Sequence, residues 1–204
     1  MIPVTKPRKP NTFDRDCRTP GNLWLAANPN SKKFPTHWIK FQPNLERGFS
    51  SRCGWWAVRI TDGPVDHYMS KKNHRHLTYE WTNYRYIAGS VNSSKGNHDD
   101  AVLDPFEVKT GWFEVILPSM QLVRTAQVPA LLQAKADFTI KQLKLANGYK
   151  IRKIRRGYYE DHKLRGLPIN LLRNYAPLVA DAVVKWQATG RPLPRVLGNH
   201  LSGG

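Results

Sequence analysis

Asp66 and His67 stand side by side in the chain, and Asn83, Asn92 and Lys95 follow them. Hydrolysis of a phosphodiester bond needs a base that deprotonates water, a divalent cation that holds the scissile phosphate, and a fixed cation for the additional negative charge. A histidine can act as the base, and the oxygens of Asp66 and Asn92 are hard ligands that suit Mg²⁺ or Mn²⁺. These residue types are therefore typical of a metal-dependent phosphodiesterase site.

The expected local elements would bring these side chains together. Asp66 and His67 are expected at the end of a strand, where successive side chains leave opposite faces, so Asp66 could hold a metal ion while His67 faces the substrate. Val91–Lys95 is expected to open a short helix. Lys95 follows Asn92 by one helical turn and would point from the same helix face toward the phosphate.

The order of these residues resembles the signature of the HNH, or ββα-metal, endonucleases. Three segments carry the resemblance: Val65-Asp66-His67-Tyr68, Trp81-Thr82-Asn83 and Val91-Asn92-Ser93-Ser94-Lys95-Gly96. The sequence looks closest to the HNH proteins of bacterial anti-phage modules, including Septu-type and retron-associated systems. Leu103-Asp104-Pro105 and the run Thr139–Leu145 also resemble that group, so the resemblance covers roughly residues 50–165. A match of several spaced segments is more specific than any one of them.

The resemblance implies a role for each residue. His67 resembles the general base, and Asp66 and Asn92 resemble the metal ligands. Asn83 resembles the middle asparagine, which braces a loop and orients the histidine, and Lys95 resembles the cation that meets the phosphate. The implied protein is an endonuclease with DNA as its expected substrate and little sequence specificity, acting in antiviral defence with a regulatory partner such as an ATPase.

One departure from the family concerns a structural metal. Many HNH proteins hold this region together with a zinc knuckle of two Cys-x-x-Cys pairs. By spacing, the four positions here are Cys53, Trp56, Ala88 and Val91, and three of these cannot ligate, so we expect no structural zinc. The aromatic residues expected to pack in place of the zinc are Trp55, Trp56, Trp81, Tyr84 and Tyr86.

The overall charge points to an anionic partner. The chain carries 32 Lys and Arg against 15 Asp and Glu, a formal net charge of +17. Such an excess attracts polyanions, chiefly nucleic acid, through their phosphates. No apolar run approaches the roughly 20 residues of a membrane-spanning helix, and none follows Met1 as a secretory signal would, so we expect no membrane partner. With Cys17 and Cys53 as the only cysteines, a disulfide framework is excluded and a cytoplasmic location is expected.

Two basic features are candidate nucleic-acid contacts. The family stretch that begins with the Asp-His pair ends in Pro-Lys, matched here by Lys71 with Ser70 in place of the proline. Residues 150–165 are expected to form a basic helix, because seven Lys and Arg outnumber Glu160 and Asp161 and leave most of its positive charge unbalanced. The contacts predicted on this helix are Arg152, Lys153, Arg155 and Arg156.

The remaining pattern predicts an α+β protein with a central ββα-metal region. We expect a hairpin of Trp55–Thr61 and Pro64–Met69 around Asp62-Gly63, because Asp-Gly between β-rich runs favours a tight turn. A strand is expected at Gly111–Leu117, helices from Val128 onward, and a last helix, Leu171–Trp186, interrupted at Pro177. The expected divisions are a basic N-terminal arm at 1–52, the nuclease core at 53–117 and a helical lobe at 118–204. Parts of the proline-rich arm are expected to wrap the domain or the ligand rather than form a core.

Two other functions remain open from the sequence. A catalytically silent, nucleic-acid-binding subunit would explain the charge and the missing zinc ligands. An HNH nuclease that cleaves RNA, such as transfer RNA, would use the same histidine, because a base can activate water or a 2′-hydroxyl alike.

Overall fold

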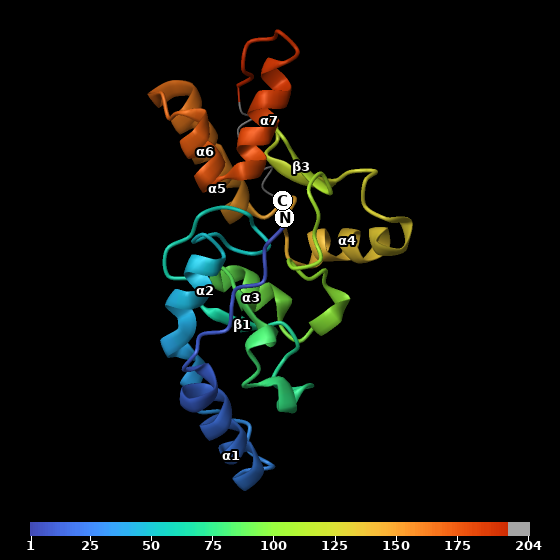
Figure 1. Cartoon of the computed structure of the whole chain (residues 1–204). Coiled ribbons are helices and arrows are strands. Elements are labelled where there is room, and N and C mark those ends of the chain that lie inside the picture. Colours follow the sequence, from blue (N-terminus) through green and yellow to red (C-terminus); the bar gives the residue numbers. More distant parts are fainter. Residues whose placement is uncertain (196–204) are drawn as a thin grey trace.

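This computed structural model describes residues 1–195 of the chain (Figure 1). They contain helices and two small antiparallel sheets joined by turns and loops. The arrangement is α+β, as the sequence predicts. The strands are β1 (Val65–His67), β2 (Tyr84–Tyr86), β3 (Phe113–Ile116) and β4 (Gln121–Arg124). The α-helices are α1 (Thr19–Ala27), α2 (Gln42–Gly48), α3 (Gly89–Lys95), α4 (Ala130–Gln142), α5 (Tyr149–Arg165), α6 (Ile169–Tyr175) and α7 (Pro177–Gln187).

The first sheet consists of β1 and β2, and α3 follows β2 almost directly. In its register Asp66 is opposite Arg85 and His67 is opposite Tyr84. The long connection between the two strands leaves β1 at Tyr68 and returns through a short helical turn at Trp81–Asn83. This order of strand, loop, strand and helix places the Asp66–His67 pair next to α3.

The expected hairpin at Asp62-Gly63 is wrong, because β1 pairs with β2 instead. Residues 55–61 form turns, with one isolated bridge between Arg52 and Arg59. Consecutive residues from Trp55 to Val58 are buried, whereas a strand on a one-sided hairpin would bury alternate residues. A run of apolar side chains that all face the interior does not have the period of such a strand.

Two hydrophobic clusters meet at the first sheet. One joins the N-terminal segment to the motif and contains Phe13, Trp38, Phe41, Leu45, Tyr79, Trp81, Tyr84 and Tyr86. The other joins residues after β2 to the C-terminal helices and contains Ile87, Val91, Leu103, Ile151, Tyr159 and Val179 among others. The first 52 residues thus contribute more to a core than expected, since Phe13 and Leu45 are almost fully buried.

The C-terminal region follows the sequence prediction more closely. Strand β3 lies within the expected run 111–117, and α6 and α7 are separate helices that meet at Pro177, where the interruption was expected. Helix α4 forms as predicted, but its first turn is not core: Leu131 is 97% exposed. In the described part of the chain, no helix has the length and apolar character needed to cross a membrane.

Candidate active site

His67 ends strand β1 and is buried against aromatic rings. Its imidazole contacts Trp38 edge-on, with ring centroids 4.7 Å apart, and Tyr84 with centroids 5.1 Å apart. Its Nε2 lies 2.9 Å from the carbonyl oxygen of Thr78. A carbonyl can only accept a hydrogen bond, so Nε2 carries the proton and Nδ1 is the basic nitrogen of the neutral ring.

Burial keeps this imidazole neutral. The low-polarity surroundings, followed by the positive charge of Lys71, lower the pKa of His67 to about 3, which the bond to Thr78 only partly offsets. The same Thr78 oxygen also accepts a hydrogen bond from the Tyr84 hydroxyl at 2.8 Å. The side chain is therefore held in one orientation and one tautomer, with an unprotonated Nδ1 at neutral pH.

Asp66 is buried beside His67 and has one oxygen without a partner. Its Oδ1 lies 3.4 Å from the ammonium group of Lys95, whereas its Oδ2 is buried and accepts no hydrogen bond from the described residues. Burial raises the pKa of Asp66, and Lys95 opposes that shift. An orphaned carboxylate oxygen in such surroundings fits a cation ligand, because a buried acceptor left unsatisfied is otherwise unfavourable.

Lys95 does not lie where the sequence predicts. It is completely buried, and its Nζ donates to the carbonyl oxygen of His67 at 3.0 Å as well as pairing with Asp66. The α3 face that carries Lys95 packs against β1, while Asn92 is exposed on another face. The expectation that Lys95 meets a phosphate is therefore wrong. Lys95 instead binds the β1 backbone and the Asp66 carboxylate in the protein interior.

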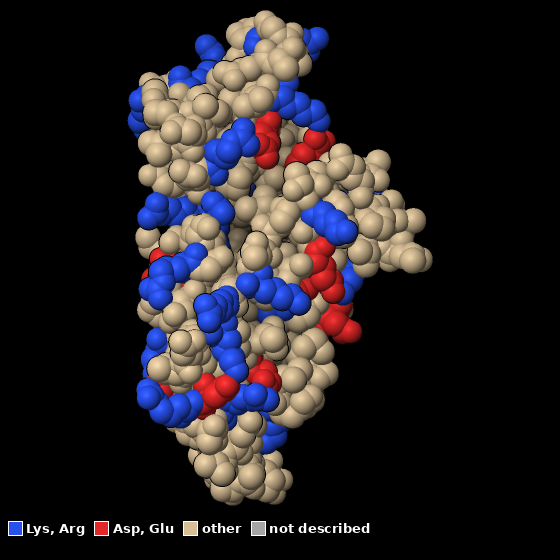
Figure 2. All heavy atoms as spheres, viewed as in Figure 1, with Lys and Arg blue, Asp and Glu red and all other residues tan. Residues whose placement is uncertain are grey.

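Asp66, His67 and Asn92 line one cleft, with a volume of about 670 Å³. Basic residues make up much of its remaining wall: Lys32, Lys71, Lys72 and Arg75. On the face of the molecule shown in Figure 2, Lys and Arg side chains are frequent along the left-hand border, with fewer acidic ones among them. The structure thus brings the predicted base and both predicted metal ligands to a cationic cleft, and it places Lys71 there as well.

Part of this wall was not predicted from sequence. Ser31, Lys32 and Phe34 come from the N-terminal segment, which Arg75 holds in place by donating to the Ser31 carbonyl at 2.6 Å and stacking 5.1 Å over the Phe34 ring. Lys71 lies 4.6 Å over the Trp38 ring. The cluster of basic residues after the Asp-His pair could have indicated Lys72 and Arg75, but no local pattern indicates that residues 31–34 fold back onto them.

Asn83 braces the loop between β1 and β2, as expected. Its Nδ2 donates to the carbonyls of Met69 and Leu77, at 2.9 and 3.0 Å, and its Oδ1 accepts from the Met69 amide at 2.7 Å. The side chain is buried and is not part of the cleft lining. It therefore fixes the two ends of the loop that carries Lys71 and Thr78.

Replacing Asn83 with alanine should lower the melting temperature and the cleavage rate together. The change leaves the backbone groups of Met69 and Leu77 unpaired in a buried setting, at a cost of about 1–3 kcal/mol each before water or the chain compensates. The Mg²⁺ concentration for half-maximal activity should stay close to the wild-type value. A large shift in that concentration with unchanged melting would instead make Asn83 a metal ligand.

The predicted contacts on the basic helix need correction. Arg155 is buried, its Nη1 donates to the carbonyls of Met120 and Leu145, and burial lowers its pKa to about 9. Arg152 is half-buried and donates to the Ser119 carbonyl at 2.8 Å, Lys153 is exposed and Arg156 is half-buried. None of the four lines the cleft of His67. Arg155 is thus a structural residue that closes a loop, and it cannot contact a phosphate.

The four positions of the missing zinc knuckle do converge. Cys53 Sγ accepts hydrogen bonds from the amides of Trp56 and Ala88, at 3.4 and 3.3 Å, and Val91 belongs to the same buried cluster. Trp55 packs in this cluster too, whereas Trp81, Tyr84 and Tyr86 pack on the N-terminal side. The expected aromatic substitute is therefore divided between the two clusters, and burial raises the pKa of the Cys53 thiol.

Elemental analysis of the purified protein should find no stoichiometric zinc. A single buried thiol among apolar neighbours cannot form the four-ligand site that structural zinc needs. Incubation with a chelator should accordingly leave the melting temperature unchanged. One tightly bound zinc per chain, or a melting temperature that drops with chelator and is restored by Zn²⁺ but not by Mg²⁺, would overturn this interpretation.

Within residues 1–195, no three His, Cys, Asp or Glu side chains converge as a potential metal site. A magnesium ion needs fewer protein ligands, because it retains several waters and accepts the amide oxygen of an asparagine. Asp66 and Asn92 meet that lower requirement. No protein-family model matches this chain, and no curated protein sequence matches it.

Proposed function

We propose that this protein is a metal-dependent endonuclease that hydrolyses phosphodiester bonds in DNA, as its resemblance to the HNH enzymes implies. The observation that carries the proposal is the state of His67. Its Nε2 is committed to the Thr78 carbonyl, its Nδ1 is unprotonated, and it shares one cleft with an orphaned carboxylate oxygen and four basic residues. A neutral histidine beside a phosphate-binding wall is suited to accept a proton from an attacking water.

The side chains of the cleft have distinct roles in the proposed hydrolysis. Lys32, Lys71 and Lys72 bind the phosphates that enter the cleft and orient the scissile bond toward His67, while Arg75 holds the segment that carries Lys32. Nδ1 of His67 takes the proton of the attacking water, and the Thr78 carbonyl favours the protonated ring that results. A phosphodiester anion beside Lys71 also offsets the positive charge that lowers the pKa of His67, so the histidine becomes a stronger base when substrate is bound.

The residues present fit a divalent cation. Asp66 Oδ2 and the side-chain oxygen of Asn92 would hold it, with waters and a phosphate oxygen as further ligands. When bound, the ion stabilises negative charge on the phosphate and on the leaving oxygen. Lys95 neutralises the other oxygen of Asp66 from inside the protein and so leaves a weaker, exchangeable site.

Replacing Asn92 with alanine should raise the Mg²⁺ concentration needed for half-maximal cleavage by roughly tenfold or more, while folding is unaffected. Asn92 is exposed, so its loss removes a ligand without opening the core. Ser93, its exposed neighbour, does not line the cleft and provides the matched control as Ser93→Ala. Equal metal dependence of both variants would remove Asn92 from the ligand set.

The first experiment is incubation of the purified chain with supercoiled plasmid and with total RNA, in Mg²⁺, Mn²⁺ or chelator. Nicked or linear plasmid that appears only with the metal supports the proposal. Metal-dependent loss of RNA with intact plasmid would favour an RNA nuclease. Binding without cleavage of either polymer would favour a silent binding subunit. A role in antiviral defence with a regulatory ATPase partner follows from the resemblance and belongs to the same proposal.

A further inference from the structure

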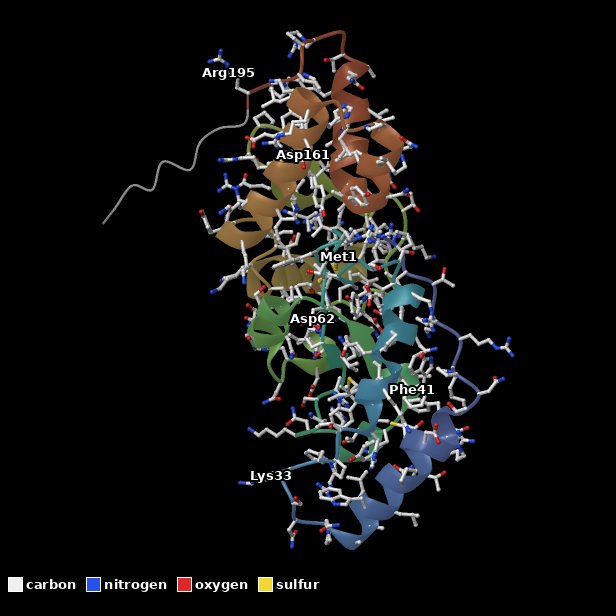
Figure 3. All side chains as sticks on the ribbon, turned by 90° about the vertical axis from the view of Figure 1, so that its left-hand side faces the viewer. Met1, Lys33, Phe41, Asp62, Asp161 and Arg195 are labelled. Carbon is white, nitrogen blue, oxygen red and sulfur yellow. The ribbon has the colours of Figure 1, made fainter. Side chains whose placement is uncertain are left out.

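A second cavity, of about 850 Å³, lies between the segment before β1, the start of α3, and helices α5 and α6. Its walls include Arg59, Gly89, Lys150, Gly157, Tyr158 and Tyr175. None of the residues assigned above to the base, the metal ligands or the phosphate wall belongs to it. In Figure 3, Asp161 on α5 and Asp62, which both border this cavity, lie above Lys33, the neighbour of Lys32 in the cleft wall.

The walls combine flat rings with two cations, Arg59 and Lys150, and two carboxylates, Asp62 and Asp161, of which Asp161 is paired with Arg165. The rings of Tyr158 and Tyr175 have centroids 5.8 Å apart, and the guanidinium of Arg59 lies 5.3 Å over the Tyr175 ring. Arg59 and Lys150 are exposed, and neither forms a salt bridge with any carboxylate of residues 1–195. Ring faces beside cations are the features that hold a base and its phosphate.

Helix α3 connects this cavity to the catalytic cleft. Gly89 borders the second cavity, whereas Asn92 and Gly96 border the cleft. Gly89 and Asn92 are about one turn apart in α3, and Gly96 directly follows the last residue of the helix. A Cβ added at Gly89 or at Gly96 would meet no atom within 4 Å, so there is free space beside both glycines. The two cavities therefore lie at opposite ends of the same short helix.

We propose that the second cavity binds the single-stranded flank of the nucleic acid whose scissile phosphate lies in the cleft. Arg59 and Lys150 contact its phosphates, and an unpaired base packs against the tyrosine rings. Single strands are favoured because the bases of a duplex are already stacked on each other and cannot reach a ring face. This inference rests on the proposed function, because it assigns a binding place to the part of the nucleic acid that extends beyond the catalytic cleft.

The test measures binding without cleavage. In chelator, anisotropy of labelled oligonucleotides of about six and about 18 nucleotides reports whether a longer strand reaches beyond the cleft. The decisive variant is Gly157→Glu, which puts a negative side chain into the cavity at a position where a Cβ meets no atom within 4 Å. Replacing a glycine inside α5 also favours the helix, so the variant should fold.

We expect Gly157→Glu to weaken binding of the long single strand about tenfold or more and to leave the short one unchanged. Gly157→Gln has the same length without the charge and should weaken it less, and Lys153→Glu on the same helix, outside the cavity, controls for a general loss of positive charge. The same lengths in DNA, RNA and duplex form identify the preferred polymer. Arg59→Gln and Lys150→Gln should each reduce the salt dependence of binding.

The two proposals fail in different ways. Unchanged binding of the long strand to Gly157→Glu, with intact melting, overturns the second cavity as a nucleic-acid site even if the protein cleaves DNA. Equal affinity of the wild-type protein for the long and the short strand would also overturn the second cavity as a nucleic-acid site. Absence of metal-dependent cleavage, with a strong effect of Gly157→Glu on binding, overturns the nuclease and keeps the cavity as a binding site.

Discussion

Replacing His67 with alanine is expected to reduce the rate of DNA cleavage by about two orders of magnitude or more, as the loss of a positioned general base does. Binding of DNA in chelator should change little, because the phosphate wall comes from the loop after β1 and from residues 31–34. Single-turnover cleavage and anisotropy, measured on the same preparation, separate the two effects. Full activity in this variant would remove His67 from the mechanism.

A control for this experiment must account for packing. His67 contacts Trp38 and Tyr84, so alanine leaves a small cavity as well as an unpaired Thr78 carbonyl. The melting temperature of each variant therefore needs to be recorded. His76→Ala is the matched substitution, since His76 is an exposed histidine of the same loop and does not line the cleft. Its activity and melting should equal those of the wild type.

Replacing Lys95 with methionine is expected to lower the free energy of unfolding by about 3–5 kcal/mol, because it leaves the Asp66 carboxylate buried and without its ion-pair partner. Chemical denaturation measures this loss. Lys185→Met provides the comparison: Lys185 pairs with Glu114 at 2.6 Å on the surface, and such an exposed pair contributes at most about 1 kcal/mol. Equal losses in the two variants would contradict the structural role of Lys95.

Magnesium should partly restore the Lys95→Met variant. If Asp66 is a metal ligand, a divalent cation can neutralise the charge that Lys95 no longer balances, so Mg²⁺ should raise the melting temperature of the variant more than that of the wild type. No such difference would separate Asp66 from metal binding while leaving its pairing with Lys95 intact.

The residues of the site could be predicted because their types and spacing are local. Asp66 and His67 end a strand, Asn83 turns the chain before the next strand, and Asn92 lies on the exposed face of the helix that follows. Lys95 could not be placed by the same reasoning. One helical turn brings it near Asn92, but the face it occupies is decided by the contact of α3 with β1, where the His67 carbonyl and Asp66 accept its ammonium.

The prediction that Arg155 contacts nucleic acid failed for a similar reason. A run of basic residues on one helix is usually a solvated or phosphate-binding face. Arg155 lies four residues from both Ile151 and Tyr159, so the helical period places it on the apolar face of α5, a signal that the charge pattern alone does not give. Its guanidinium joins two carbonyls on other segments, those of Met120 and Leu145, in the interior. The prediction of a hairpin at Asp62-Gly63 failed because β1 pairs with β2, which comes after the long loop. The backbone of Tyr84–Tyr86 pairs with β1, and the rings of Tyr84 and Tyr86 pack in the N-terminal cluster.

The position of β2 between the two hydrophobic clusters has a consequence for how the chain opens. Tyr84 and Tyr86 pack with the N-terminal residues, and Ile87 and Ala88, directly after them, pack with the C-terminal helices. No partial unfolding of one side can release this strand, since the other cluster still holds it. The backbone amides of β2 should thus exchange with solvent only through global unfolding. Residues 53–117 cut from the chain would lose the N-terminal partners of Tyr84 and Tyr86 and the C-terminal helices of the other cluster.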